Sequence, residues 1–217
     1  MDNGPTDSGM NILAIETSVP QASLCLYLNG EFCVSTAWEA ERNHDEYLFP
    51  ALEQAMEALR RDHAHLDYIL VGAGPGSYGG VRVALAAGVG IATVTGARLV
   101  AVESWAQLAS GSACVVSDAR RGGWTVRHPD GHIDVLSPEE LNGLGLPVYS
   151  VEVSGVLQAK GIERVEKEGL CPTARGLVQT WLDMTPEAQA HAAGKPAEPI
   201  YVRPPHITKA VRKPWEI

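Results

Sequence analysis

The chain has 217 residues and an ordinary globular composition, in which 45% of the residues are hydrophobic and 20% are charged. This length suits one large domain or two of about 100 residues, with enough apolar side chains for a hydrophobic core. Lys and Arg number 17 against 26 Asp and Glu, which gives a net charge of -9. Because nucleic-acid affinity rests largely on cations that neutralise phosphates, this balance argues against direct, unaided RNA binding.

Cysteine usage and the start of the chain bear on the compartment. The four cysteines form no CxxC pair and no zinc-ligand spacing, so we expect structural thiols in a reducing cytoplasm: Cys25, Cys33, Cys114 and Cys171. Residues 1–10 are polar and turn-rich, without the basic start and apolar centre of a signal peptide, so we expect a flexible tail. No run of about 18 apolar residues is evident, so we expect no membrane partner.

Three short apolar runs from Asn11 onward predict an antiparallel β-meander: "NILAIETS", "ASLCLYL" and "EFCVSTAW". The Asn-Gly pair between the second and third runs is a strong hairpin signal. Apolar residues at helical spacing then predict a helix that has Asn43 as its N-cap and a kink at Pro50. The elements expected after the meander are a helix (43–61), a strand (66–71), a helix (77–95) and a strand (98–102).

This βββαβαβ order is that of one half of an RNase H-like, actin-like domain. A second meander follows ("ACVVSDAR", "GWTVRH", "HIDVL"), and then two short helices, the second with Thr185 as N-cap and Pro186 in its first turn. "EPIYVRPP" predicts a closing strand. We predict an α/β, actin-like fold of two RNase H-like lobes, the second reduced. Its expected parts are a flexible tail (1–10), the first lobe (11–104), the smaller second lobe (105–198), and the closing strand with a basic tail (199–217).

The stretch "GAGPGSYGGVR" resembles a phosphate-binding loop. It fits the dinucleotide-binding pattern G-x-G-x-x-G between a strand and a helix. That pattern follows the first strand of a βαβ unit, however, whereas the strand before this loop is the fourth of its unit, which argues against dinucleotide binding. No lysine follows the last glycine, which excludes a P-loop NTPase. Two readings stay open: a weak anion site at a helix start capped by Ser77, or a tight turn that packs the helix against the sheet.

A carboxylate, Glu16, ends the first predicted strand next to two hydroxyl residues. It could hold a magnesium-bound water or simply close the hairpin. The candidate vestigial anion or nucleotide cleft therefore comprises Glu16, Thr17, Ser18, Gly74, Gly76 and Ser77. We expect no metal from the histidines, because "HPDGH" forms a turn rather than the helix face on which zinc-binding pairs lie.

The helix after the glycine loop has an unusual composition. It carries no charge apart from Arg82, and it contains Gly88 and Gly90, each of which costs a helix about 1 kcal/mol relative to Ala. Such a helix depends on packing, either in the core of this chain or against a partner.

These segments together resemble the TsaB (YeaZ) family. The resemblance rests on "NILAIETS", "NHDEYLFPAL", "GAGPGSYGGVRVALAAGVGIA", "VAVESWAQLA", "DARRG" and "EPIYVR", and "GPGSYGGVR" is close to the family's GPGSFTGLR. It implies an actin-like (ASKHA) fold and a non-catalytic scaffold subunit without cofactors. Its implied partner is a TsaD-like transferase, which places threonylcarbamoyl on N6 of an adenosine in tRNA. A TsaE-like ATPase would be a third member, and tRNA would be contacted only through the complex. The surface that pairs with the transferase could instead pair two copies of this chain when it is alone.

The same resemblance implies where the partner binds. The two helices of the first lobe would present the interface through His44, Leu48, Leu52, Val81, Arg82 and Leu85. The catalytic relative binds metal through a helical H-x-x-x-H, whereas here Leu48 stands four residues after His44, so no metal is expected. The alternatives are an actin-like nucleotide-binding enzyme and a metallopeptidase-like protein.

Overall fold

The computed structural model describes residues 9–39, 44–119, 122–153 and 155–202. The predicted N-cap Asn43, most of the predicted N-terminal tail and the basic C-terminal tail lie outside these ranges. The elements of the first half are β1 (Ile12–Glu16), β2 (Gln21–Leu28), β3 (Glu31–Glu39), α1 (His44–Arg61), β4 (Tyr68–Gly72), α2 (Tyr78–Thr95), β5 (Arg98–Val102) and the 3-10 helix η1 (Ala106–Leu108). They reproduce the predicted βββαβαβ order.

The first sheet has the strand order β3-β2-β1-β4-β5. Strands β1, β2 and β3 are antiparallel, whereas β1, β4 and β5 run parallel, so that Ile12 lies beside both Tyr27 and Tyr68. Strand β1 is buried on both faces, since its alternate residues point to opposite sides of the sheet. Leu13 and Ile15 pack in the core that α1 and α2 share, and Ile12 and Ala14 pack beneath a helix from much later in the chain.

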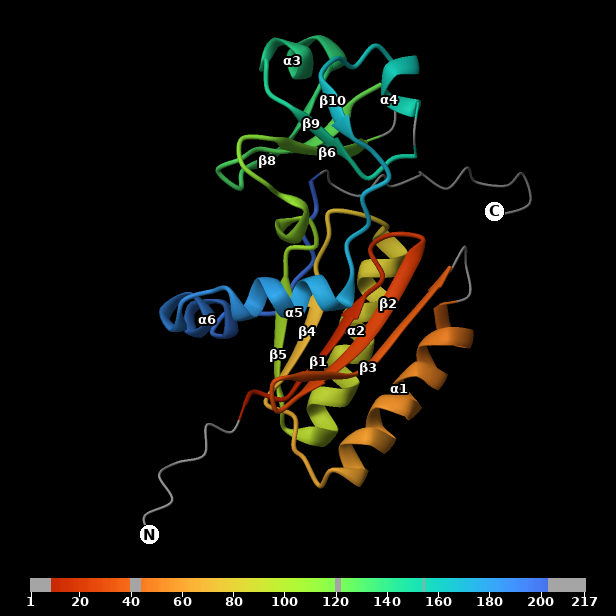
Figure 1. Cartoon of the computed structure of the whole chain (residues 1–217), viewed down its shortest axis with the longest axis vertical. Helices are drawn as coiled ribbons and strands as arrows, with labels where there is room; N and C mark the ends of the chain where they lie inside the picture. Colours follow the sequence, from red (N-terminus) through yellow and green to blue (C-terminus); the bar gives the residue numbers. More distant parts are fainter. Residues whose placement is uncertain (1–8, 40–43, 120–121, 154, 203–217) are drawn as a thin grey trace, which may run out of the picture.

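The second half forms a second sheet in the order β10-β9-β6-β7-β8. Read from β8, this order repeats that of the first sheet, with three antiparallel strands followed by two parallel ones. The helices α3 and α4 stand where α1 and α2 stand in the first lobe, but they have 6 and 4 residues instead of 18 and 18. The predicted pair of RNase H-like lobes with a reduced second lobe is thus confirmed (Figure 1). The elements are β6 (Cys114–Asp118), β7 (Trp124–Arg127), β8 (Ile133–Leu136), α3 (Pro138–Gly143), β9 (Val148–Ser150), α4 (Val156–Ala159) and β10 (Val165–Lys167).

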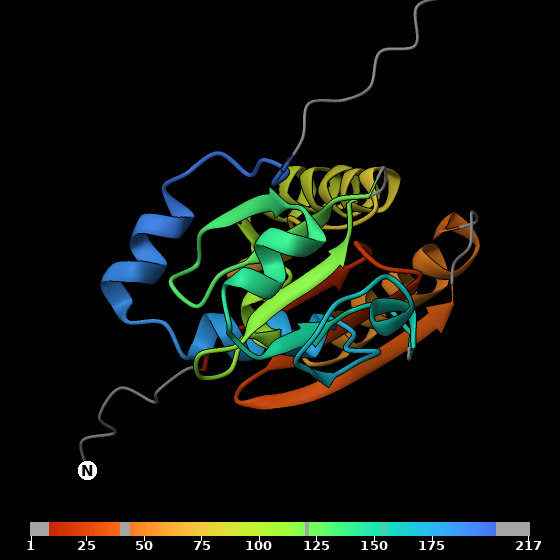
Figure 2. The ribbon, with the colours of Figure 1, turned by 90° about the horizontal axis from the view of Figure 1, so that it is seen from above.

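The chain then returns to the first lobe. Helices α5 (Ala174–Leu182) and α6 (Pro186–Ala193) fall inside the range predicted for the second lobe, but α5 packs on the first sheet (Figure 1). Trp181 is fully buried there, with its ring 4.9 Å from that of Tyr68, and the amide of Ala174 donates to Ser23 Oγ at 2.9 Å. The apolar stripe of α5 covers the sheet face that α1 and α2 leave open. Viewed from above, the second lobe lies over the end of the first, and α6 projects beyond it (Figure 2).

The predicted closing strand is wrong for the residues that the structure describes. Residues 199–202 have no strand geometry. A single ladder-like contact is present, in which the amide of Ile200 donates to the carbonyl of Ala73 at 2.8 Å. Pro199 has no amide hydrogen to extend that pairing. The segment is therefore attached to the first lobe by this bond and by the hydrogen bond from Arg82 to the Tyr201 hydroxyl rather than added to its sheet.

Candidate functional site

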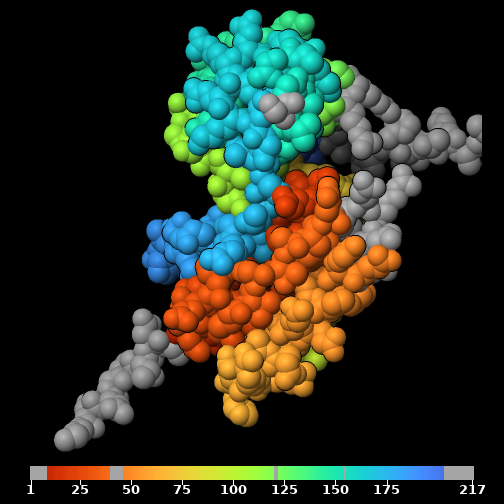
Figure 3. All heavy atoms as spheres, turned by 45° about the vertical axis from the view of Figure 1, so that its right-hand side comes forward, coloured from red at the N-terminus to blue at the C-terminus, as the bar shows by residue number. Residues whose placement is uncertain are grey.

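A cleft of about 950 Å³ lies between the two lobes. In the space-filling view the molecule narrows at this level (Figure 3). The cleft is walled by the turn after β1, the glycine loop before α2, the ends of β6 and β9, and the segment after β10. The side chains and backbone atoms on its walls come from Ser18, Val19, Pro20, Gln21, Glu39, Gly76, Ser77, Tyr78, Gly79, Val81, Ser117, Asp118, Ala119, Thr125, Val151, Glu152, Val153, Gly169, Leu170, Cys171, Ile200, Tyr201 and Val202.

The glycine loop is packed against the turn that follows β1. The amide of Ser77 donates to the carbonyl of Ser18 at 2.6 Å, and the hydroxyl of Thr17 donates to the carbonyl of Gly80 at 2.7 Å. The Ser77 hydroxyl in turn accepts from the amide of Gly80 at 3.2 Å, which confirms the predicted N-cap of α2. The chain itself thus uses two of the four amides at this helix start, those of Ser77 and Gly80.

The glycines of the loop are required by this close approach. A Cβ at Gly76 would lie within 3 Å of the carbonyl of Ser18, and one at Gly80 would lie within 3 Å of the carbonyl of Thr17. Gly74 has φ +88°, which favours glycine. Of the two readings that the sequence left open, these contacts favour the tight turn that seats the helix against the sheet.

The predicted cleft residues do come together, but at two depths. Ser18, Gly76 and Ser77 reach the wall of the cleft, whereas Glu16 and Thr17 are fully buried beneath it. One Glu16 oxygen, Oε1, accepts from the amide of Ser18 at 2.7 Å, and Oε2 has no hydrogen-bond partner among the described residues. Burial raises the pKa of Glu16, and the nearby hydroxyls of Ser104 and Ser18 oppose that rise.

Two neighbours of this carboxyl group were missed by the sequence analysis. A Cβ on Gly72 would overlap the Glu16 carboxyl group, so the end of β4 has to be a glycine if β1 carries this glutamate. Ser104 follows β5 and exchanges hydrogen bonds with Gly74: its amide donates to the Gly74 carbonyl at 2.9 Å, and its hydroxyl accepts from the Gly74 amide at 3.1 Å. The position of Gly72 directly after a buried strand was the available signal. The structure therefore supports the reading in which Glu16 closes the hairpin.

A second candidate feature is the outer face of α2. Val89 and Val94 have 54% and 87% of their surface exposed. The two interior glycines differ: a Cβ at Gly88 would overlap Leu99 and Val71, whereas one at Gly90 would meet nothing within 4 Å. Gly88 therefore seats the helix on the sheet, and Gly90 lies on the open face.

Helix α2 is also long and apolar enough to cross a membrane, by length and composition alone. Its 18 residues have a mean hydropathy of 1.3, and 28% of them are buried in the fold. Helices that cover a sheet in globular domains meet the same criterion, so length and composition alone do not make α2 a span. The finding does show that a long, apolar helix keeps much of its surface uncovered.

The predicted interface residues whose side chains are described divide into three groups. Leu48 and Val81 are only 2% and 4% exposed, so the expectation that they face a partner is corrected: Leu48 packs in the core of the first lobe, and Val81 lies beside Gly74 at the wall of the cleft. Leu52 and Leu85 are partly buried against the same core. Arg82 is exposed, with its guanidinium 3.8 Å from the centre of the Tyr78 ring and its Nε donating to the Tyr201 hydroxyl at 3.1 Å. His44 begins α1, and its side chain lies outside the described part of the structure.

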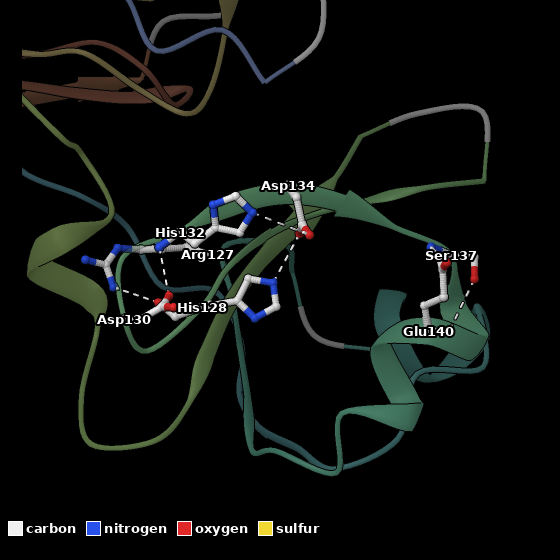
Figure 4. Close-up of polar contacts among 7 residues, drawn as sticks. All are labelled: Arg127, His128, Asp130, His132, Asp134, Ser137 and Glu140. Carbon is white, nitrogen blue, oxygen red and sulfur yellow. Dashed lines mark hydrogen bonds and ion pairs between the residues drawn. The ribbon is translucent and has the colours of Figure 1, made fainter.

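The histidines of "HPDGH" lie at the turn between β7 and β8. Both rings approach one carboxylate, with His128 Nε2 3.1 Å from Asp134 Oδ1 and His132 Nε2 3.9 Å from Asp134 Oδ2 (Figure 4). Asp130 accepts from the amide of His132 at 2.9 Å, as the predicted turn requires. Across the described ranges, no group of three or more His, Cys, Asp or Glu side chains has the geometry to hold a metal ion.

An ion pair beside this hairpin joins the two lobes. Arg127, at the end of β7, pairs through Nε with Oε1 of Glu103, in the segment that follows β5. The two side chains are only 12% and 21% exposed. Burial raises the pKa of Glu103, and Arg127 opposes that rise. The sequence offered no signal for this pair, because its members lie in different predicted lobes.

Three kinds of similarity to known proteins agree with this architecture. Residues 38–136 match the family model described as TsaD, tRNA N6-adenosine threonylcarbamoyltransferase. A stretch of 84 residues, 37% of this chain, is 38% identical to the tRNA threonylcarbamoyladenosine biosynthesis protein TsaB of Buchnera aphidicola subsp. Baizongia pistaciae. A stretch of 63 residues, 29% of this chain, is 43% identical to the tRNA N6-adenosine threonylcarbamoyltransferase of Erythrobacter litoralis. The chain spans 36% and 18% of the lengths of these two relatives.

Solved structures extend the similarity over the whole fold. YeaZ from Pseudomonas aeruginosa aligns with a TM-score of 0.66 and 24% identity, over 89% of this chain and all of that one. A second structure, described as a protein with similarity to peptidase YEAZ from Pseudomonas aeruginosa, aligns with a TM-score of 0.67 and 23% identity, over 90% of this chain and all of that one. The resemblance to TsaB (YeaZ) that the sequence indicates is thereby confirmed.

Proposed function

We propose, from this likeness to TsaB (YeaZ) in fold and in local sequence, that the chain is a non-catalytic scaffold subunit in the synthesis of N6-threonylcarbamoyladenosine in tRNA. In this proposal it binds and activates a TsaD-like transferase. A TsaE-like ATPase joins the complex, and tRNA is contacted through the complex rather than by this chain alone.

The observation that carries the proposal is the uncovered face of α2. Ala86, Val89, Gly90, Thr93 and Val94 are exposed along successive turns, and none of them is charged. Exposed apolar surface of this kind is typical of protein–protein contacts, and small residues such as Gly90 let another backbone come close. We define this set of five residues as the α2 face.

The glycine loop supports a scaffold rather than a nucleotide-dependent enzyme. The amide of Ser77 at the start of α2 is bonded to the carbonyl of Ser18. The space that a side chain at Gly76 or Gly80 would need is occupied by the backbone of the turn after β1. A TsaD-like partner fits the α2 face because this chain is itself similar to TsaD over residues 38–136, and subunits that share a fold can pair through equivalent helices in a pseudo-twofold arrangement.

Co-expression with a TsaD-like subunit tests the proposal. We expect a stable heterodimer in light scattering, and Val89→Arg and Val94→Arg should each dissociate it while the free chain keeps its thermal unfolding midpoint. The matched control is Val153→Arg, because Val153 is 70% exposed but lies in the second lobe. The same variants should reduce threonylcarbamoyl transfer to tRNA by the transferase in proportion to lost binding.

Other outcomes separate the alternatives. A heterodimer that survives both arginine substitutions would overturn the α2 face as the interface. If the free chain is a dimer that the same substitutions split, the α2 face also serves self-association. Binding of ATP or zinc by the free chain in calorimetry would favour the enzyme alternatives instead.

A further inference from the structure

The cleft between the lobes has acidic walls. Three carboxylates line it, namely Glu39, Asp118 and Glu152, and none of the described lining residues is a Lys, Arg or His. Asp118 is paired with Lys160, whose Nζ lies 2.6 Å from Asp118 Oδ2. Within the described ranges, neither Glu39 nor Glu152 forms an ion pair, and Glu152 Oε1 accepts the amide of Asp118 at 2.9 Å. The cleft therefore suits a cationic occupant.

The described part of the chain ends at the rim of this cleft. Ile200, Tyr201 and Val202 form part of its wall. This segment is held in place by the hydrogen bond from the Ile200 amide to Ala73 and by the bond from Arg82 to the Tyr201 hydroxyl. Whatever follows Val202 thus starts at the cleft rather than at a distant surface.

The segment that follows has the opposite charge. Residues 203–217 contain Arg203, Lys209, Arg212 and Lys213 against a single acid, Glu216, while the preceding 202 residues contain 13 Lys and Arg against 25 Asp and Glu. Fifteen residues can reach about 50 Å when extended, which exceeds what crossing the cleft requires.

We propose that residues 203–217 bind in the cleft of their own chain, with their ammonium and guanidinium groups against Glu39 and Glu152. A segment tethered at the rim faces an effective concentration in the millimolar range, so weak ion pairs suffice to hold it there. RNA is the other anion that a basic segment could meet, but the acidic remainder of this chain repels RNA and attracts the segment. The inference is independent of the partner proposed for the α2 face.

Zero-length coupling by a carbodiimide tests the placement on the full chain. We expect amide links from Lys209 or Lys213 to Glu39 or Glu152, formed within one molecule in a mixture of isotope-labelled and unlabelled protein. They should fall severalfold in 0.5 M salt, because exposed ion pairs are screened. Links that instead join the segment to Asp62 or Asp67, in the polar hollow at the opposite end of the first sheet, would overturn the proposal.

Protease access gives an independent readout. Trypsin should cut after Lys209 and Arg212 about fivefold faster in Glu39→Gln/Glu152→Gln than in the parent chain, as expected for loss of two exposed ion pairs. The matched control is Glu31→Gln, at the other end of β3 and away from the cleft. Equal cutting in all three proteins would refute the contact. So would binding of labelled tRNA by the free chain that requires the segment and ignores the cleft substitutions.

Discussion

The backbone amide of Ser77 donates a 2.6 Å hydrogen bond to the backbone carbonyl of Ser18. This bond joins the N-terminal end of α2 to the turn after β1, the two segments between which an actin-like fold could hold a phosphate. Because the loop backbone is packed against this turn within the chain, the glycine loop serves close packing, and the outer apolar surface of α2 stays uncovered.

The loop glycines should differ sharply in their tolerance of alanine. Gly80→Ala places a Cβ on the carbonyl of Thr17, so we expect it to lower the free energy of unfolding by about 3 kcal/mol or more. The measurement is urea denaturation followed by far-UV circular dichroism.

Gly79→Ala is the control for this substitution. A Cβ at Gly79 meets nothing within 4 Å, and alanine favours helix, so its effect should be neutral or a gain of up to about 1 kcal/mol. Equal losses in the two variants would contradict the packing role of Gly80.

Glu16 should make stability depend on pH. Since burial raises its pKa above the value in the unfolded chain, the folded state binds the proton more tightly, and its contribution is fully present only below the unfolded value of about 4.3. Stability is then lost as the pH rises through the folded pKa. Glu16→Gln keeps an oxygen for the Ser18 amide and removes the ionisation, so we expect it to be more stable than the parent chain at pH 7 to 8.

The comparison between pH 4 and pH 8 isolates this effect. The free energies of unfolding of the two proteins should differ least at pH 4. The pKa of Glu103 is also raised, but Glu103 is present in both proteins, so its contribution cancels in the difference. If the stability difference between Glu16→Gln and the parent does not change with pH, the pKa of Glu16 is the same in the folded and unfolded chains; if the loss grows as the pH rises, that pKa is lowered in the fold and the expected sign is wrong.

Neighbouring residues of α1 should respond in opposite ways to arginine. Leu48→Arg buries a charge in the core of the first lobe and should prevent folding, and even Leu48→Ala should cost about 2–5 kcal/mol. Phe49 is 66% exposed, so Phe49→Arg should leave the unfolding midpoint within a few degrees of the parent. Soluble, folded Leu48→Arg protein would show that this part of α1 is not a core element.

The ion pair between Arg127 and Glu103 should couple the lobes. Arg127→Met leaves a mostly buried carboxylate without its partner, so we expect a loss on the order of 2–3 kcal/mol. Without Arg127 the pKa of Glu103 rises further, so the loss should grow as the pH rises through the raised folded pKa that Glu103 has in the parent. Amide hydrogen exchange in β7 should be faster in the variant than in the parent chain.

A second substitution checks the cause of that loss. Adding Glu103→Gln to Arg127→Met should recover part of the stability at neutral pH, because it removes the unpaired charge. A double variant less stable than Arg127→Met would mean that Glu103 has other partners that matter more.

The local features of this protein follow from short stretches of its sequence. Strand and helix periodicity predicted the meander, α1, α2 and the second meander, and the caps Ser77 and Thr185 stand where hydroxyl residues precede helices. These features depend on neighbours within a few residues, so short-range patterns are sufficient. The order of the strands along the chain also predicted two lobes of the same kind.

Which surface each element covers depends on contacts between distant parts of the chain. Leu48 and Phe49 are adjacent apolar residues, yet one lies in the core and the other faces solvent, because the sheet lies on one side of α1. Helix α5 follows the second lobe in sequence but covers the first, since that sheet had an open face. The amide of Ser77 is bonded to the carbonyl of Ser18, a contact that neither segment indicates on its own. In each case the deciding contact joins residues far apart in the chain, and no local pattern records it.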